Sequence, residues 1–177
     1  MPPVVEVKDL GAHAGREVTV LGWVEGTRTH GKVAFLDLRD GTGLVQGVVV
    51  QKQVGEEVWA IHQALTQETA AAVTGEVRDE PRAPGGYELG VASIRVVGPS
   101  GEYPIQPKGH GVEFLLDHRH LWLRSSQQRA GLRVRHEVEQ AIHDFFYERG
   151  FTRIDTPILT GAIGEHAGTL FETDYFG

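Results

Sequence analysis

Short runs of alternating apolar and polar positions fill the first hundred residues, a pattern typical of β-strands. Residues 16–28 (REVTVLGWVEGTR) and 33–40 (VAFLDLRD) are rich in β-branched and aromatic side chains. A turn over residues 40–43 (DGTG) leads into a third run, 44–51 (LVQGVVVQ), because glycine supplies the positive φ that a tight hairpin needs. We therefore expect three consecutive strands in this part of the chain.

A helical period then interrupts the strands. Apolar side chains recur at spacings of three and four within residues 56–65 (EEVWAIHQAL), which indicates a helix. Strand character returns at residues 68–78 and again, after a turn rich in proline and glycine, at residues 87–97. Three strands, a helix and two strands predict the five-stranded barrel called the OB-fold, which commonly binds single-stranded nucleic acid.

The second half of the chain reads differently. Residues 99–111 (PSGEYPIQPKGHG) are dense in proline and glycine, which predicts an interdomain linker. Ser125 or Ser126 can cap a helix that runs to about residue 149, and Gly150 follows where a left-handed residue ends a helix. The apolar stripe of this helix, at spacings of three and four, consists of Val134, Val138, Ala141, Ile142 and Phe145.

Residues 151–158 (FTRIDTPI) predict a short strand after that helix. A long helix and one strand cannot close a core, because a strand needs neighbours. We therefore expect these residues to contain only the first elements of a second domain. The predicted fold class is α+β, with a barrel over residues 1–100, a linker or hinge over 101–120 and the start of a second domain over 121–177.

Alternation on the second strand separates two faces, and the aliphatic one carries Ala34, Leu36 and Leu38. Phe35 shares the opposite face with Asp37 and Arg39. If the aliphatic face points into the barrel, Phe35 points out, where it can stack on a base with about 1–3 kcal/mol of stabilisation. Arg28 can meet a phosphate or a base edge, and Gln46 offers both a donor and an acceptor. The same pattern also fits a phenylalanine packed under a loop and polar residues that are merely solvated.

Composition and charge narrow the function. The formal net charge of −7 argues against general affinity for nucleic acid, because phosphate binding usually leaves a basic footprint. Residues 119–135 are a local exception, with five arginines and no carboxylate, although a solvated helix start gives the same pattern. The absence of cysteine excludes a disulfide framework and fits a reducing cytoplasm. No run is long enough to span a membrane, so we expect a cytoplasmic protein without a membrane partner.

Three histidines, His110, His118 and His120, raise the question of a metal site. His118 and His120 would share a face in a strand, but no cysteine supplements them, and we expect hydrogen-bonded linker histidines and no metal. The chain has no GxxxxGK[ST] phosphate loop, and no spacing links a serine to a base. The residues alone therefore assign no catalytic group.

Several segments, in chain order, resemble the class II aminoacyl-tRNA synthetases of subgroup b. Residues 22–50 (GWVEGTRTHGKVAFLDLRDGTGLVQGVVV) resemble the anticodon-binding barrel shared by the aspartate, asparagine and lysine ligases. Residues 114–125 (FLLDHRHLWLRS) resemble the hinge, and the wording RHLWLR is closest to asparagine–tRNA ligases. Residues 145–160 (FFYERGFTRIDTPILT) resemble motif 1, the helix and strand that open the antiparallel-sheet catalytic domain.

The resemblance implies roles for individual residues. Phe35 falls where the family stacks an aromatic ring on the central anticodon base, and Gln46 where it hydrogen-bonds anticodon bases. Arg28 falls on a position that contacts the first anticodon bases. Phe151 and Pro157 fall within motif 1, which forms the dimer interface, so the resemblance implies a homodimer.

A further segment, residues 164–176 (GEHAGTLFETDYF), resembles the mobile active-site loop of the family. Glu165 matches the glutamate whose carboxylate helps to hold the ammonium group of the amino acid. His166 stands where the family usually has glycine.

The implied reaction attaches asparagine to its tRNA through an asparaginyl-adenylate made with ATP. It needs arginines from motifs 2 and 3 and Mg²⁺ held by carboxylates, and none of those segments occurs in these 177 residues. We therefore expect no catalytic residue, no bound ATP or Mg²⁺ and no activity from this chain alone. The alternatives are an aspartate–tRNA ligase, a non-catalytic tRNA-binding barrel and, with least support, a generic single-strand-binding barrel.

Overall fold

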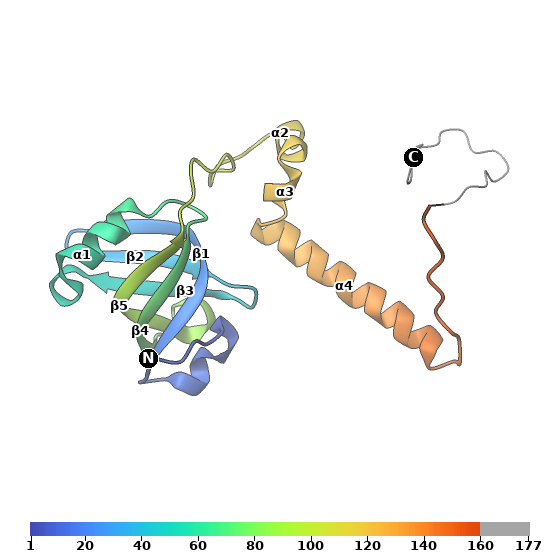
Figure 1. Ribbon diagram of the computed structural model, residues 1–177, viewed down its shortest axis with the longest axis horizontal. Helices are drawn as coiled ribbons and strands as arrows, with labels where there is room; N and C mark the ends of the chain where they lie inside the picture. Colours follow the sequence, from blue (N-terminus) through green and yellow to red (C-terminus); the bar gives the residue numbers. More distant parts are fainter. Residues whose placement is uncertain (160–177) are drawn as a thin grey trace, which may run out of the picture. The chain divides into compact units, whose positions relative to one another are not determined.

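The structure, a computed structural model, describes residues 1–159 (Figure 1). The chain divides into two compact units, residues 1–114 and residues 115–177, and each is described by itself. Among the helices of the described residues, none is both long enough and apolar enough to cross a membrane.

The first unit contains a closed barrel of five strands. These are β1 (Glu17–His30), β2 (Val33–Arg39), β3 (Leu44–Val50), β4 (Ala70–Asp79) and β5 (Tyr87–Gly98). The strands follow one another around the barrel in the order β1-β2-β3-β5-β4, and β4 closes it by pairing with β1. Only the β3–β5 pairing is parallel among them. This arrangement confirms the predicted OB-fold and the α+β class.

Helix α1 (Gln51–Ala64) lies between β3 and β4 in sequence and packs on the barrel (Figure 1). It begins five residues before the predicted start. Gly55 interrupts the helical conformation with a φ of 76°, so the regular period that the sequence displays begins only after it. The side chains of Val54, Val58 and Ile61 pack against the barrel core from this helix.

The barrel interior is filled by alternate residues of the strands. Ala34, Leu36 and Leu38 of β2 are completely buried, together with Val18, Val20 and Val24 of β1. Because successive side chains of a strand point to opposite faces, their neighbours in sequence face outward. Phe35 is only half-buried on that outer face, as the alternation on β2 predicted.

A 3₁₀ helix, η1 (Val7–His13), precedes the barrel and was not predicted. The Asp40 carboxylate attaches it: one oxygen accepts the Val7 N–H at 2.8 Å, and the other accepts the N–H groups of Thr42 and Gly43 at 2.7 and 2.8 Å. Burial tends to raise the pKa of Asp40, but these hydrogen bonds outweigh it and hold the pKa below its usual value. A second 3₁₀ turn, η2 (Pro84–Gly86), connects β4 to β5.

Residues 99–111 contain neither helix nor strand. Two short helices follow, α2 (Val112–Asp117) and α3 (Arg119–Trp122), and neither was predicted. His120 therefore lies in a helix, and the strand geometry that would place it on one face with His118 is not adopted.

The long helix α4 (Ser126–Tyr147) confirms the predicted helix of the second unit. Ser125 occupies the N-cap position, but its hydroxyl makes no capping bond and has no hydrogen-bond partner among the described atoms. At the other end Gly150 has a φ of 79°. The N–H of Gly150 bonds to the carbonyl of Tyr147 and the N–H of Phe151 bonds to the carbonyl of Phe146, which is a Schellman cap.

The predicted strand over residues 151–158 is not formed: residues 151–159 include no helix or strand. A strand exists through its hydrogen bonds to a neighbour, and the strands of the described residues all belong to the barrel. The segment that resembles motif 1 therefore consists of the end of α4 followed by residues 151–159, which form no strand pairing.

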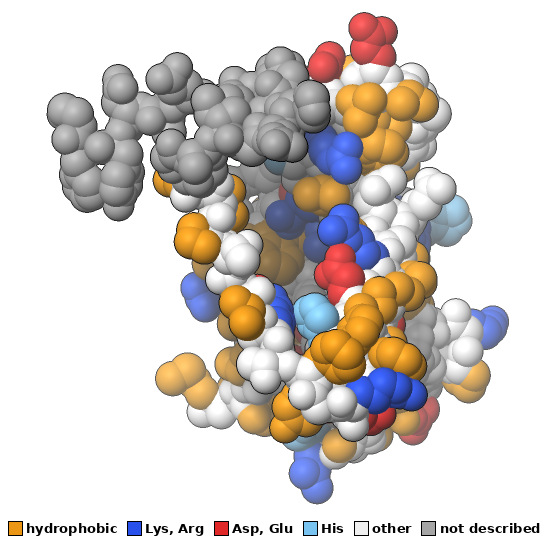
Figure 2. Space-filling view, turned by 90° about the vertical axis from the view of Figure 1, so that its right-hand side faces the viewer, with side chains coloured by type: hydrophobic (Ala, Val, Ile, Leu, Met, Phe, Trp, Pro, Cys, Tyr) orange, Lys and Arg blue, Asp and Glu red, His pale blue; other side chains and the backbone are white. Residues whose placement is uncertain are grey.

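The apolar stripe of α4 lies at the surface, as expected for a helix without a covering sheet. Val134, Val138, Ile142 and Phe145 are each about half exposed or more. Hydrophobic side chains are visible at the surface beside arginine and lysine in the space-filling view (Figure 2).

Candidate nucleic-acid interface

The outer face of β1, β2 and β3 brings together the three residues that the sequence suggested for base recognition. In the β1–β2 pairing, Arg28 lies opposite Phe35. In the β2–β3 pairing, Asp37 lies opposite Gln46. Since Phe35 and Asp37 are two residues apart on one strand, all four side chains occupy one face of three adjacent strands.

Arg28 joins this group through both arms of its guanidinium. Its Nη1 donates to Asp37 Oδ2 at 2.8 Å, and its Nη2 donates to Gln46 Oε1 at 2.5 Å. Its Cζ atom also lies over the Phe35 ring, 5.3 Å from the ring centroid, within the range of a cation–π contact. An aromatic ring, a cation and an amide are therefore held side by side on an accessible surface.

The backbone beneath Phe35 is tied to α1. His62 is 2% exposed, and its Nε2 lies 3.0 Å from the carbonyl oxygen of Phe35. Because a carbonyl only accepts, Nε2 carries a hydrogen and donates it to Phe35, and Nδ1 lies 3.3 Å from the Gln63 Nε2. The sequence analysis assigned no role to His62. Its position beside the apolar residues of the predicted helix could have indicated that it is buried.

Arg39 was expected on the outer face with Phe35, and it is there, but it is buried to 6% exposure. Its Nη2 lies 2.7 and 2.9 Å from the two carboxylate oxygens of Glu68, and its Nε lies 2.8 Å from Glu25 Oε1. The Trp23 ring covers it at 5.7 Å. Alternation predicts the face on which a side chain lies but not what covers it, so the strand pattern does not predict this cluster.

Glu68 holds its place in that cluster with an unusual backbone. Its φ is 66°, the one positive value among the described residues other than glycine, and its N–H donates to the Val24 carbonyl at 2.7 Å. A left-handed conformation costs an ordinary residue free energy, so it persists where the surrounding contacts require it. The ion pairs with Arg39 supply such contacts.

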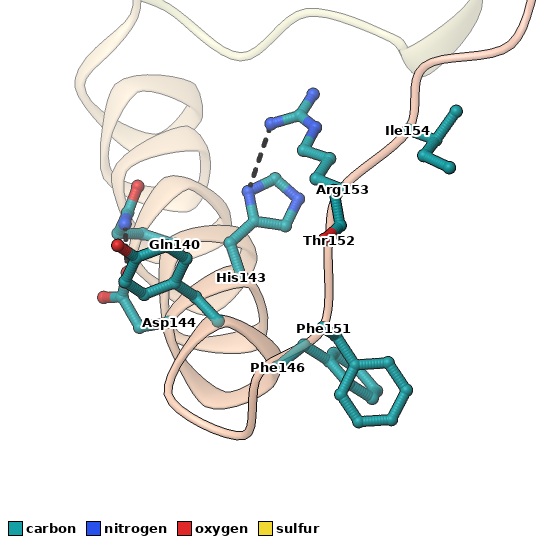
Figure 3. A pocket seen from close by; sticks show the side chains of 9 residues that line it. Gln140, His143, Asp144, Phe146, Phe151, Thr152, Arg153 and Ile154 are labelled. Atoms are coloured by element: carbon teal, nitrogen blue, oxygen red, sulfur yellow. Dashed lines mark hydrogen bonds between the residues drawn. The ribbon is translucent and has the colours of Figure 1, made fainter.

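The second unit has an open groove of about 550 Å³ between the end of α4 and the segment that follows it (Figure 3). Arg153 points toward His143 across the groove, with Nη1 3.4 Å from Nδ1. Phe151 packs edge-on against Phe146, with ring centroids 5.3 Å apart, and remains 61% exposed. Pro157 lies further along the same segment and is exposed.

The remaining predicted residues fall elsewhere. Glu165 and His166 lie outside the described residues. His110 stacks on Phe114 with centroids 4.9 Å apart, and its Nε2 lies 3.1 Å from both the N–H and the carbonyl of Gln106, as predicted for a hydrogen-bonded linker histidine. Within residues 1–159 no three histidine or acidic side chains cluster closely enough to hold a metal ion among themselves.

Two protein families match separate parts of the chain. Residues 18–97 match the family described as OB-fold nucleic acid binding domain, and residues 111–176 match the family described as tRNA synthetases class II (D, K and N). The chain is thus similar, over residues 111–176, to the class II aminoacyl-tRNA synthetases of that group.

Within the group the chain is similar to asparagine–tRNA ligases. It is 52% identical to the asparagine–tRNA ligase of Sorangium cellulosum over 99% of this chain and 40% of that protein. It is also 52% identical to the ligase of Chloroflexus aurantiacus, over 98% of this chain and 40% of that protein. The chain thus spans about two fifths of the length of these curated relatives.

A solved structure is also similar to this chain. The crystal structure of asparaginyl-tRNA synthetase from Pyrococcus horikoshii complexed with asparaginyl-adenylate matches 99% of this chain and 41% of that one. The TM-score is 0.86 and the sequences are 34% identical. The match includes both the barrel and the segment that follows it.

Proposed function

We propose that this chain reads the anticodon and begins the catalytic domain of an asparagine–tRNA ligase, which attaches asparagine to its tRNA with ATP. The observation that carries the proposal is the meeting of Arg28, Phe35 and Gln46 on the outer face of the barrel. The similarity to asparagine–tRNA ligases over nearly the whole chain supports the choice of amino acid.

The chemistry of the three side chains suits an unpaired anticodon base. Phe35 offers a π-face on which any base can stack. Gln46 offers a hydrogen-bonding group that distinguishes base edges. Arg28 lies next to both residues, with its guanidinium over the Phe35 ring and one arm bonded to the Gln46 carbonyl. Stacking gives affinity and the amide gives selectivity.

The proposed domains are the barrel over residues 1–100, a hinge over 101–120 and the start of the catalytic domain over 121–177. No catalytic residue is assigned within this chain. ATP and Mg²⁺ belong to the proposed reaction, but residues 1–159 provide no cluster that suits Mg²⁺, and no step is derived through either. Glu165 is proposed to contact the ammonium group of asparagine. The enzyme is proposed to be cytoplasmic.

A homodimer through motif 1 is part of the proposal. The groove after α4, the half-exposed apolar stripe on that helix and the exposed ring of Phe151 support it, because apolar surface of this extent favours a protein contact. Pro157 is proposed to lie in the same interface.

Two other functions remain to be separated by experiment. An aspartate–tRNA ligase would share the barrel, and the similarity to ligases for asparagine argues against it. A tRNA-binding barrel without a catalytic role would not need residues 111–176, which match the class II synthetases.

The test of the proposal is binding of the 177-residue chain to an RNA stem-loop that carries the asparagine anticodon. A stem-loop of the same length and composition with a scrambled loop is the control. We expect clear preference for the anticodon loop by fluorescence anisotropy. Equal affinity for both would point to a generic single-strand-binding barrel and reject anticodon reading.

A further inference from the structure

Asp37 lies in the middle of the candidate interface, paired with Arg28. Its side chain is 24% exposed, and its Oδ2 accepts from Arg28 Nη1 at 2.8 Å. It lies opposite Gln46 in the β2–β3 register. A carboxylate beside an RNA site repels phosphate unless it is paired, and here Arg28 pairs with it.

The bond between Arg28 and Gln46 determines how the amide of Gln46 is oriented. The chemistry of the partner decides which end of the amide faces Arg28. A guanidinium has only donors, so the Gln46 atom 2.5 Å from Arg28 Nη2 must be the carbonyl oxygen. The other end of the amide is therefore its NH₂ group, which has no hydrogen-bond partner among the described residues.

We infer that Asp37 is a positioning residue that, through Arg28, makes Gln46 present a donor and not an acceptor to the base. This rests on the proposed function. An unconstrained glutamine amide turns over easily and can satisfy either kind of base edge. With Asp37 holding one arm of the guanidinium, the other arm is fixed over the Gln46 carbonyl, and the amide cannot turn without losing that bond.

The NH₂ donor of Gln46 determines the class of base that this residue accepts. A donor at Gln46 pairs with a carbonyl oxygen, such as O4 of uracil, and meets another donor where cytosine carries its N4 amino group. The position therefore selects a keto base over an amino base. Two donors that face each other cannot form a hydrogen bond. An amino base therefore loses the hydrogen bond and also leaves both donors without an acceptor, which weakens binding.

The effect can be separated from folding. The Arg28–Asp37 ion pair is at the surface, with side chains 56% and 24% exposed, and such pairs contribute little to stability. Glu76 provides a matched control because its carboxylate also forms a surface ion pair, 3.1 Å from Arg78, on β4, which pairs with neither β2 nor β3.

The experiment measures the affinity of the 177-residue chain for two anticodon stem-loops that differ only in uracil or cytosine at the central position. The ratio of the two dissociation constants is determined for the wild type, Asp37→Ala, Gln46→Ala, the double variant and Glu76→Ala. We expect the wild type to prefer uracil by about tenfold or more. Asp37→Ala should lose most of that preference, with an unchanged thermal midpoint, while Glu76→Ala keeps it.

The double variant shows whether Asp37 acts through Gln46. If it does, Asp37→Ala removes no further selectivity once Gln46→Ala is present, whereas direct contact of Asp37 with the base gives additive losses. Gln46→Glu gives an independent check: the carboxylate still accepts from Arg28 but has no donor, so the preference for uracil should disappear in a folded protein.

Two failures have different meanings. A wild type that does not prefer uracil, or whose binding is unaffected by Phe35→Ala, overturns the proposed function and this inference with it. A wild type that prefers uracil and depends on Phe35, but keeps its preference in Asp37→Ala, leaves the proposed function standing and overturns the positioning role of Asp37.

Discussion

The buried ring of His62 lies 3.0 Å from the carbonyl oxygen of Phe35 and so joins helix α1 to strand β2. The side chain of Phe35 is on the outer face of the barrel, and its backbone is fixed from the helix. A base that stacks on Phe35 therefore meets a surface whose position is set before binding.

His62→Ala tests that relationship. The change leaves a cavity and a carbonyl without its donor, so we expect a loss of about 2–4 kcal/mol in the free energy of unfolding. Urea denaturation measures it, with the exposed His30→Ala as the control, which should change stability by less than about 0.5 kcal/mol. Equal effects of the two variants would mean that His62 is not a structural contact.

Arg39→Ala removes the cation from a pair that is almost completely buried. Glu68, with its side chain 10% exposed, would keep its charge without a partner, and we expect a loss of about 3–5 kcal/mol. Arg28→Ala is the matched control because its guanidinium is 56% exposed, and it should cost less than about 1 kcal/mol. Arg39→Met should be milder than Arg39→Ala if apolar packing can replace part of the cluster.

The Asp40 carboxylate predicts a dependence of stability on pH. Its pKa in the folded protein lies below the ordinary value that it has in the unfolded chain, so folding favours the ionised form. The stabilisation is fully present above the unfolded pKa and is lost as the pH falls through the folded pKa.

Asp40→Ala should therefore be less stable than the wild type at pH 7, and the difference should shrink as the pH is lowered below about 4. Chemical denaturation across this range measures the difference. Glu57→Ala, an exposed carboxylate on α1, should leave stability unchanged at pH 7. A constant difference between wild type and Asp40→Ala at every pH would rule out the role of the Asp40 charge.

Two glycines of the second unit should respond to alanine in opposite directions. Gly150 has a φ of 79° in the cap of α4, so Gly150→Ala should destabilise the helix end by about 1 kcal/mol. Gly131 lies inside the exposed helix, and a Cβ added there meets nothing within 4 Å, so Gly131→Ala should stabilise it by roughly 0.5–1 kcal/mol. Amide hydrogen exchange of residues 126–151 distinguishes the two, and effects of the same sign would contradict the cap.

The barrel was predictable because its first three strands alternate over most of their length and one helical period separates the third strand from the fourth. The same alternation put Phe35 outside, since Ala34 and Leu36 had to face the core. Its proximity to Arg28 and Gln46 depends on the register of three strands, which the family resemblance suggested and local patterns did not contain.

Other features depend on contacts between distant parts of the chain. Arg39 is buried by side chains from β1 and from the loop before β4, and no periodicity in sequence encodes that cover. The segment at residues 151–158 has the composition of a strand, but strand formation requires a partner. The helix η1 lacks an apolar period and is held by Asp40, 33 residues from Val7.

The central claim is that Phe35 and its neighbours read an anticodon base, and the most direct measurement is the affinity of the chain for the asparagine anticodon stem-loop before and after Phe35→Ala. Tyr147→Ala, an exposed aromatic of the other unit, is the control. Phe35→Ala should weaken binding by roughly 5- to 150-fold, equivalent to about 1–3 kcal/mol, while Tyr147→Ala should have no effect. Unchanged affinity in a folded Phe35→Ala protein would contradict it.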